Sequence, residues 1–492
     1  MPTFLIYTLG CKVNQYESQY VREGLERLGF QEARAGEKVD IGVVNTCTVT
    51  AESDLKSRKI IRHLARQHPE AKLVVMGCYA SRAPQDLANL PGVVQLIRDK
   101  AELPEWLRQL GLADPPQGIS SFGPRHRAFV KVQDGCQQRC RYCIVPLVRP
   151  MLRSRFPQEV LEEIQRLVWA GYREIVLTGI HLGHYGLDLP APRPSLTDLV
   201  KEILELPGSF RVRLSSLEAM EIRPELLRLL SAQADRFCPH LHLPLQSGSN
   251  SILDRMGRPY RLEDFLKICD QIRFWLDSPA LTTDILIGFP GETEEDFQAT
   301  CRAVEQVGFS KIHIFPFSPR PGTPAAQMPD RPPVGVVRCR CEQMRHIAQR
   351  LRRQYMESLL GRTVQVLVEE VLDTTDKEDL SLPLSTPLKG EYSTIPCGHF
   401  TSGSLCKIRL NSHTTQNSSG SCSGKSYWPQ NAAPNNVSVL RGTSERYVPV
   451  YFLGSPSWIG QLLVLQPQGV FEPEQDRFAL WAGAIAENPC RV

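Results

Sequence analysis

The sequence predicts an α/β protein made of an open parallel α/β domain, a partial (β/α)6 barrel and a small C-terminal β-barrel. Three observations lead to this fold class. Strand–helix units repeat with a cysteine after each strand, six more strand–helix units follow a linker, and a late β pattern is split by a low-complexity insertion. We therefore expect domains at residues 1–112, 122–352 and 361–492, the last carrying an insertion at 373–443.

The N-terminal domain is expected because an apolar run is followed by a cysteine three times. The runs and their cysteines are residues 4–9 with Cys11, residues 41–46 with Cys47, and residues 73–77 with Cys78. The spacing suits β-α-β units, which need about 30 residues. Consecutive parallel strands would place the three thiols at one sheet edge, where open α/β sheets bind ligands. Taken singly, each cysteine could instead be a small buried hydrophobe.

The barrel is expected after a Pro/Gly/Ser-rich linker at 114–124. The predicted strands are 129–133, 174–178, 211–215, 240–245, 281–287 and 311–315. The predicted helices are 157–170, 196–206, 224–230, 262–275 and 293–307. Alternating strands and helices favour a parallel barrel with its chemistry on the loops after the strands.

The C-terminal region begins with a basic helix at 334–360, which is followed by a β pattern at 363–371. The segment 373–443 is rich in Ser, Thr, Asn, Gly and Pro, a composition typical of a loop insertion or a disordered segment. Strand-like sequence resumes at 446–453 and at 460–465.

Bulk composition fits a soluble cytoplasmic protein. The chain has 492 residues, 42% of them hydrophobic, and a formal net charge of +4. The N-terminus has no basic segment typical of a signal peptide, and no run approaches the ~18 apolar residues of a membrane span, so we expect no membrane partner. Fifteen cysteines in a reducing compartment indicate metal or catalytic chemistry rather than disulfides.

The strongest motif is a C-x3-C-x2-C run, formed by Cys136, Cys140 and Cys143 just after the first barrel strand. Three closely spaced thiolates can converge on one iron–sulfur cluster and leave one iron open, as catalytic metal sites leave a position for substrate. A zinc site or three unrelated buried cysteines are the alternatives. Zinc would need a fourth ligand, and the run contains none.

The run, with Tyr142 between its last two cysteines, resembles the radical S-adenosylmethionine superfamily. The resemblance implies a 4Fe–4S cluster that binds S-adenosylmethionine at its open iron. It also implies reductive cleavage to a 5′-deoxyadenosyl radical that abstracts hydrogen from an unactivated C–H bond.

Further segments resemble the methylthiotransferases over roughly residues 1–360. They are Leu9-Gly10-Cys11-Lys12-Val13-Asn14, Asn45-Thr46-Cys47-Thr48, Gly77-Cys78-Tyr79-Ala80, Leu177-Thr178-Gly179-Ile180-His181, Ser215-Ser216-Leu217-Glu218 and Leu245-Gln246-Ser247-Gly248-Ser249. This resemblance implies a second 4Fe–4S cluster held by Cys11, Cys47 and Cys78. It also implies cofactor contacts at Thr178, Gly179, Glu218 and Gln246, and a C-terminal TRAM-like RNA-binding barrel.

Within that family, Lys12-Val13-Asn14 is similar to the branch acting on N6-threonylcarbamoyladenosine at position 37 of tRNA. The implied reaction consumes two S-adenosylmethionine molecules, one as methyl donor and one as radical source. It also needs an electron donor such as flavodoxin or ferredoxin. Alternatives are isopentenyladenosine in tRNA or a ribosomal-protein side chain as substrate. A more distant one is a non-catalytic iron–sulfur or zinc protein that only binds RNA.

Two features bear on binding. The family has an Arg-Gly step where this chain has Arg149-Pro150-Met151-Leu152, and replacing glycine removes φ freedom from that loop. The arginines between Arg338 and Arg353 could follow the phosphates of a tRNA anticodon arm, or could belong to a solvated amphipathic helix.

Overall fold

The computed structural model describes residues 1–123, 125–372, 381–382, 406–407, 438–474 and 477–484. The chain forms two compact units, Met1–Leu351 and Arg352–Val492. The predicted fold class is confirmed: a parallel α/β sheet and a partial barrel make up the first unit, and the second is rich in β-strands. None of the described helices is long and apolar enough to cross a membrane.

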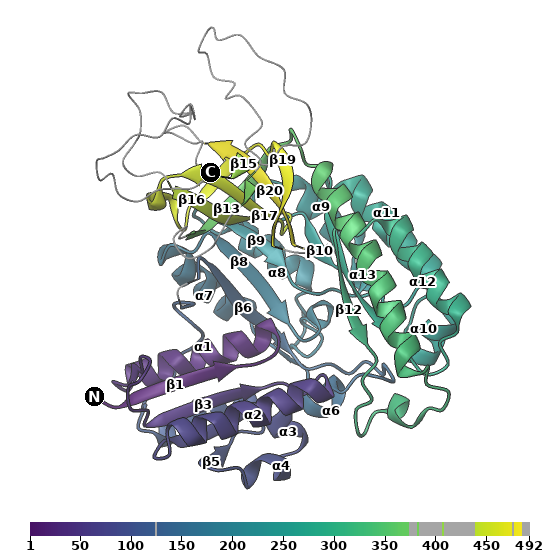
Figure 1. Cartoon of the computed structure of the whole chain (residues 1–492). Helices are drawn as coiled ribbons and strands as arrows, with labels where there is room; N and C mark the ends of the chain where they lie inside the picture. The colour runs from purple at the N-terminus through teal and green to yellow at the C-terminus, as the bar shows by residue number, and fades with distance from the viewer. Residues whose placement is uncertain (124, 373–380, 383–405, 408–437, 475–476, 485–492) are drawn as a thin grey trace, which may run out of the picture. The chain divides into compact units, whose positions relative to one another are not determined.

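The N-terminal sheet has the strand order β2-β1-β3-β4-β5, and all of its pairings are parallel. Its strands are β1 (Thr3–Thr8), β2 (Gln31–Glu32), β3 (Ile41–Thr46), β4 (Lys72–Gly77) and β5 (Val93–Leu96). Its helices are α1 (Lys12–Arg27), α2 (Ala51–Gln67), α3 (Cys78–Arg82), α4 (Gln85–Ala88) and α5 (Leu103–Gln109), with a 3-10 turn η1 (Lys100–Glu102). α1 and α5 pack on one face of the sheet, and α2, α3 and α4 on the other (Figure 1).

The central part contains the six predicted parallel strands. They are β6 (Arg127–Asp134), β8 (Glu174–Gly179), β9 (Arg211–Leu214), β10 (His240–His242), β11 (Ala280–Ile287) and β12 (Lys311–Pro316). β6, β8 and β9 form one sheet and β10, β11 and β12 another, and parallel bridges such as Ser216 with His242 join the two. A short β7 (Arg153–Ser154) runs antiparallel to β6 at the edge. This arrangement is an open six-stranded barrel rather than a closed one.

The predicted barrel helices are present with small shifts at their ends. They are α7 (Pro157–Trp169), α8 (Leu196–Glu205), α9 (Pro224–Ala232), α11 (Leu262–Trp275) and α12 (Glu294–Val307). Five short elements are not predicted from the sequence: α6 (Val145–Val148), α10 (Asn250–Met256) and the 3-10 turns η2 (Leu182–His184), η3 (Ala219–Glu221) and η4 (Pro324–Gln327). These elements are only one or two turns long, too short for a helical period to stand out.

Local sequence explains where the longer barrel helices begin. A capping box formed by Ser195 and Asp198 starts α8, and another formed by Thr293 and Asp296 starts α12. Proline occupies the first position of α7, where its missing N–H costs nothing. Each helix then buries an apolar stripe in the large hydrophobic core around the strands.

The second unit begins within α13 (Val334–Glu357) and contains a six-stranded sheet of order β18-β13-β16-β17-β20-β19. Its strands are β13 (Val364–Val371), β16 (Ser438–Ser444), β17 (Pro449–Gly454), β18 (Leu462–Leu465), β19 (Gly469–Glu474) and β20 (Arg477–Ala484), with a 3-10 turn η5 (Pro456–Trp458). Two short strands, β14 (Ser381–Leu382) and β15 (Cys406–Lys407), pair with each other. Phe452, Val366 and Leu463 lie in the apolar core of this unit.

The insertion expected at 373–443 differs from the structure at its end. Residues 438–443 belong to β16, which pairs with both β13 and β17. Gly442 weakens the β character of this strand in the sequence, because glycine is depleted in strands. Most of the remaining insertion, residues 373–380, 383–405 and 408–437, lies outside the described residues.

Candidate active site

The three cysteines of the N-terminal domain lie at one edge of its sheet. Cys11 caps the start of α1 after β1, Cys47 follows β3, and Cys78 is the first residue of α3 after β4. Because β1, β3 and β4 are parallel neighbours, all three positions lie at the carboxyl ends of strands. Cys47 and Cys78 are buried and Cys11 is exposed. The structure therefore brings together the first predicted set of ligands.

Asn14 fixes the loop that carries Cys11. Its Nδ2 donates to the carbonyl oxygens of Leu9 at 2.8 Å and of Thr46 at 3.1 Å, so it links this loop to the end of β3. The side chain is 1% exposed, and its Oδ1 accepts a hydrogen bond from Arg149 at 3.0 Å. The asparagine of the Lys12-Val13-Asn14 motif thus supports the cysteine site rather than facing solvent.

Gly77 allows the start of α3, which carries Cys78, to lie close to the end of β3. Its φ is +98°, and a Cβ at this position would lie 2.3 Å from the carbonyl oxygen of Thr46. Any side chain here would push the start of α3 away from the neighbouring strand. Burial raises the pKa of the Cys47 thiol, and the nearby Cys78 thiol adds to the rise.

The second set of cysteines occupies the loop after β6. Cys136 is buried, and Cys140 and Cys143 are half-buried. The Cys143 N–H donates to the carbonyl of Cys140 at 3.1 Å, which turns the run back on itself. Burial raises the pKa of the Cys143 thiol to about 12, and the Cys140 and Cys136 thiols add to the rise. Three neighbouring thiols can be deprotonated together when they bind a cation, so the donor set fits an iron–sulfur cluster.

The loop after α6 packs directly against this run. A Cβ on Gly135, whose φ is +82°, would lie 1.9 Å from the carbonyl oxygen of Met151. The Cys136 N–H donates to the carbonyl of Arg149 at 3.1 Å. None of residues 149–152 has a positive φ. Proline at position 150 is therefore accommodated without the backbone freedom that a glycine would have supplied.

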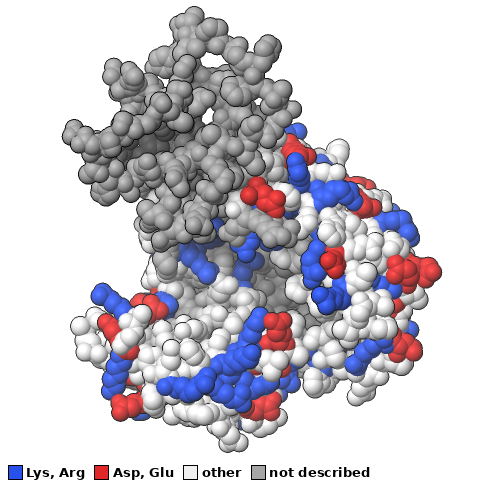
Figure 2. Space-filling view, in the orientation of Figure 1, with Lys and Arg blue, Asp and Glu red and all other residues white. Residues whose placement is uncertain are grey.

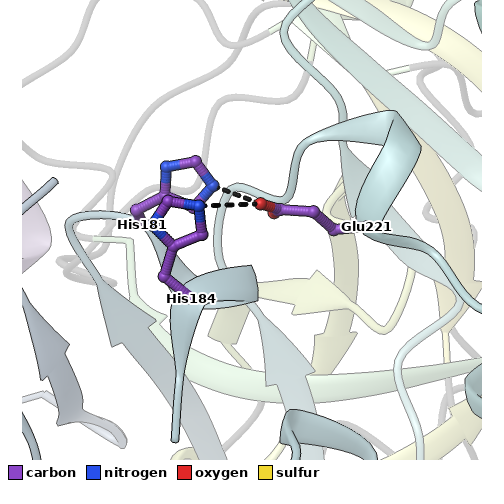
Figure 3. A group of neighbouring side chains, drawn as sticks. All are labelled: His181, His184 and Glu221. Carbon is purple, nitrogen blue, oxygen red and sulfur yellow. Dashed lines mark hydrogen bonds and ion pairs between the residues drawn. The ribbon is translucent and has the colours of Figure 1, made fainter. Parts of the chain in front are cut away.

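A histidine and a glutamate lie against Cys136. His181 Nδ1 is 3.4 Å from the Cys136 Sγ, and His181 Nε2 is 2.5 Å from Glu221 Oε1. His184 stacks on His181 with ring centroids 3.6 Å apart, and Figure 3 shows both imidazoles turned toward Glu221. Burial by itself would lower the pKa of His181, but its bonds to Cys136 and Glu221 outweigh it and raise the pKa to about 9.

These two imidazoles and the carboxylate have ligand atoms within 4.8 Å of one another, a donor set that suits a metal ion. Because His181 also contacts Cys136, we assign the trio to the cysteine site, as support for that ligand. Within the described part of the chain, His184 Nδ1, Glu221 Oε2 and Ser215 Oγ are buried without a hydrogen-bond partner. Such atoms beside the strand ends suit a polar ligand, as the amino-acid part of S-adenosylmethionine would be.

Arg258 connects the second cysteine set to Glu218, one of the predicted cofactor residues. Its Nη1 is 3.4 Å from the Cys140 Sγ, and its Nη2 forms an ion pair with the Glu218 carboxylate. The guanidinium is buried beside Cys140. Arg258 follows Gly257, a left-handed residue that ends α10. Arg258 is not predicted from the sequence, where the Gly257 stop signal is its only local marker.

Thr178 and Gly179 lie at the carboxyl end of β8, where Thr178 is buried and Gly179 half-buried. Gln133 joins this end to the loop after β6. Its Oε1 accepts from the His181 N–H at 2.8 Å, and its Nε2 donates to the Gly135 carbonyl at 2.8 Å. The two predicted cofactor residues and the second cysteine set therefore share one hydrogen-bonded edge.

Gln246, the last predicted cofactor residue, has a φ of +68°. Its N–H donates to the Asp284 carbonyl at 2.8 Å, and its own carbonyl accepts from the Leu286 N–H at 2.9 Å. A left-handed conformation costs a non-glycine residue about 1–3 kcal/mol and recurs at ligand sites. The backbone here is held in a strained state at the position where a cofactor contact was expected.

Arg149 lies between the two cysteine sets. Its Nε is 3.4 Å from the Cys78 Sγ, and its Nη1 donates to Glu17 and to Asp134 at 2.8 Å each. Its carbonyl accepts from the Cys136 N–H, so one residue bonds to a cysteine of each set. Burial alone would lower the pKa of Arg149, but Glu17, Cys78 and Asp134 hold it well above its usual range.

Several arginines of the helix α13 pair with carboxylates of the same chain. Three of its arginines pair with carboxylates: Arg340 with Glu292, Arg350 with Glu305 and Arg353 with Glu357. Arg338 and Arg345 are exposed. This pattern fits the amphipathic-helix alternative better than a continuous phosphate-binding row.

Comparison with known proteins identifies both parts of the first unit. Residues 3–99 match the uncharacterized protein family UPF0004, and residues 130–304 match the radical SAM superfamily. The chain is 37% identical over 398 residues to the threonylcarbamoyladenosine tRNA methylthiotransferase MtaB of Bacillus subtilis, covering 77% of this chain and 88% of the relative. The chain belongs to the radical SAM methylthiotransferase family. As a member of it, the protein uses a 4Fe–4S cluster and S-adenosylmethionine.

Other members of the radical SAM methylthiotransferase family are similarly close. The MtaB of Thermotoga maritima is 39% identical over 383 residues, covering 75% of this chain and 87% of the relative. A tRNA-2-methylthio-N(6)-dimethylallyladenosine synthase of Corynebacterium urealyticum is 35% identical over 396 residues, covering 75% and 72%. The family and enzyme class expected from the cysteine motifs are thus confirmed.

Proposed function

We propose that this methylthiotransferase acts on tRNA and replaces the C2 hydrogen of N6-threonylcarbamoyladenosine at position 37 by a methylthio group. The observation that carries the proposal is the pair of three-cysteine sites within one folded unit, bridged by Arg149. Adenine C2–H is neither acidic nor open to an ordinary nucleophile. One site for radical formation and a second for carrying sulfur account for its substitution.

The Lys12-Val13-Asn14 motif and the relatives named for threonylcarbamoyladenosine support this choice of substrate. The tRNA anticodon arm would be the macromolecular partner, with a flavodoxin or ferredoxin as electron donor and the cytoplasm as the place of action. Two S-adenosylmethionine molecules would be consumed per product, one as methyl donor and one as radical source.

We assign one 4Fe–4S cluster to Cys136, Cys140 and Cys143, and a second to Cys11, Cys47 and Cys78. Three thiolate ligands would leave a position for S-adenosylmethionine on the barrel cluster and a position for sulfur on the N-terminal cluster. When bound, the barrel cluster and S-adenosylmethionine supply the one-electron chemistry that removes an unreactive hydrogen.

The chain's own residues hold and orient these groups. Thr178, Gly179, Glu218 and Gln246 are assigned as contacts to S-adenosylmethionine. Arg258 donates an N–H to the Cys140 sulfur and Arg149 donates one to the Cys78 sulfur. Such hydrogen bonds stabilise charge on a ligating thiolate and tune the reduction potential of a cluster.

Substrate choice is tested with matched tRNAs carrying threonylcarbamoyladenosine, isopentenyladenosine or plain adenosine at position 37. We expect methylthiolation of the threonylcarbamoyl form only, detected by mass spectrometry of nucleosides after digestion. A product formed only from the isopentenyl form, or on a ribosomal protein, would overturn the substrate assignment and leave the enzyme class standing.

The division of labour between the two sites is tested by changing Cys11, Cys47 and Cys78 to Ala. Because these residues lie at the N-terminal sheet, outside the barrel loops, formation of 5′-deoxyadenosine should persist while methylthiolation falls below detection. Both products are measured by chromatography in the same reaction. Loss of both in a folded variant would mean that the N-terminal site also serves the radical step.

A further inference from the structure

Helix α2 carries a basic face that the sequence analysis did not single out. Residues 55–69 contain five Lys and Arg residues and no Asp or Glu. Ile61 and Leu64 bury the opposite face of the helix against the sheet. The exposed cations are Lys56, Lys59, Arg62 and Arg66, and His63 is exposed beside them. Figure 2 shows the band of Lys and Arg that these side chains form along the helix.

Most of these cations have no internal counter-charge. Lys56 pairs with Glu52 at 2.7 Å. Among the described residues, no carboxylate forms an ion pair with Lys59, Arg62 or Arg66. They stand three and four positions apart, so like charges face one another on adjacent turns, which destabilises an isolated helix. A surface selected only for solubility would alternate the two signs.

The helix that carries the basic face begins beside the proposed sulfur site. Ser57 of α2 donates to the carbonyl of Cys47 at 3.4 Å, and Asp54 accepts from Thr48 at 2.6 Å, so the first turns border the Cys47 loop. The α-helix rises about 1.5 Å per residue, so Arg66, the last of these cations, lies roughly 24 Å along the helix axis from the N-cap residue Thr50. A polyanion whose base reaches the cysteines would have its backbone within reach of this face.

We propose that the exposed face of α2, formed by Lys59, Arg62 and Arg66, binds the phosphate backbone of the RNA substrate. The proposal rests on the proposed function, since it takes tRNA as the polyanion. Phosphates would supply the counter-charge that the helix lacks, and their release of bound counterions would make binding depend on salt. On α13, by contrast, three arginines already pair with carboxylates of the chain.

The test compares binding of a fluorescent anticodon stem-loop to the whole protein and to the triple variant Lys59→Gln, Arg62→Gln, Arg66→Gln. The matched control removes three exposed cations from outer barrel helices: Lys201→Gln on α8, Lys267→Gln on α11 and Arg302→Gln on α12. Both variants lose the same net charge. Thermal unfolding checks that each remains folded.

We expect the α2 variant to bind roughly 10- to 100-fold more weakly, with the slope of log K against log salt reduced by about 2 to 3. The control should keep the slope of the unchanged protein. Equal slopes for the α2 variant and the unchanged protein would overturn this inference but would not contradict the proposal that RNA is the substrate. If the unchanged protein shows no salt-dependent binding of the stem-loop, the proposed function fails together with it.

Discussion

Changing Cys136, Cys140 and Cys143 together to Ala should leave the protein with one cluster instead of two and abolish formation of 5′-deoxyadenosine. The three thiols are grouped on the loop after β6, and the described barrel offers no second set of cysteines on that loop that could replace them. Iron and sulfide per chain and the nucleoside product of S-adenosylmethionine cleavage are measured after anaerobic reconstitution. Full iron content in this variant would contradict the assignment.

Cys301 provides the control for that experiment. It is buried in the hydrophobic core and lies in the middle of α12. Burial raises the pKa of its thiol to about 11, which keeps it protonated and a poor metal ligand. Cys301→Ala should therefore retain the iron content and the cleavage activity of the unchanged protein.

Changing Arg149 to Met should lower the free energy of unfolding by about 3–5 kcal/mol, the usual cost of leaving one partner of a buried ion pair alone. Glu17 and Asp134 would lose the guanidinium that each bonds at 2.8 Å, in a site where Arg149 is 4% exposed. Urea-induced unfolding of the metal-free protein measures the change. Adding Glu17→Gln and Asp134→Asn to the variant should recover part of it.

The control for Arg149 is a surface pair of the same type. Arg153 bonds Asp99 at 2.5 and 2.6 Å, but both side chains are more than 40% exposed. Exposed pairs contribute at most about 1 kcal/mol, so Arg153→Met should have a small effect. If Arg153→Met and the Arg149 variant lowered the free energy of unfolding equally, the burial of the Arg149 network would not explain the effect of the Arg149 variant.

The elements that could be predicted from the sequence are those with a long local signal. The six barrel strands and five of their helices have apolar periods that persist for several residues. A cysteine follows each of β1, β3, β4 and β6 within three residues. Parallel pairing of β1, β3 and β4 places Cys11, Cys47 and Cys78 at one edge of the sheet, so their proximity can be predicted from the sequence.

The supporting residues could not be found in the same way. Arg149 and Glu17 are 132 positions apart, and Arg258 and Cys140 are 118 apart. An arginine in such a place has the same local sequence as a surface arginine, and only the fold decides which one is buried. The strand β16 was missed for a different reason, because its partners β13 and β17 rather than its composition stabilise it.

The contacts of Arg149 make the N-terminal segment and the barrel segment of the first unit depend on each other. The guanidinium comes from the barrel segment, while Glu17 and Cys78 come from the N-terminal segment. Residues 1–112 alone would lack the guanidinium that pairs with Glu17 and the N–H donor that reaches the Cys78 thiol. A chimera that joins two relatives at the 114–124 linker would keep this bridge only if both sides of it are preserved.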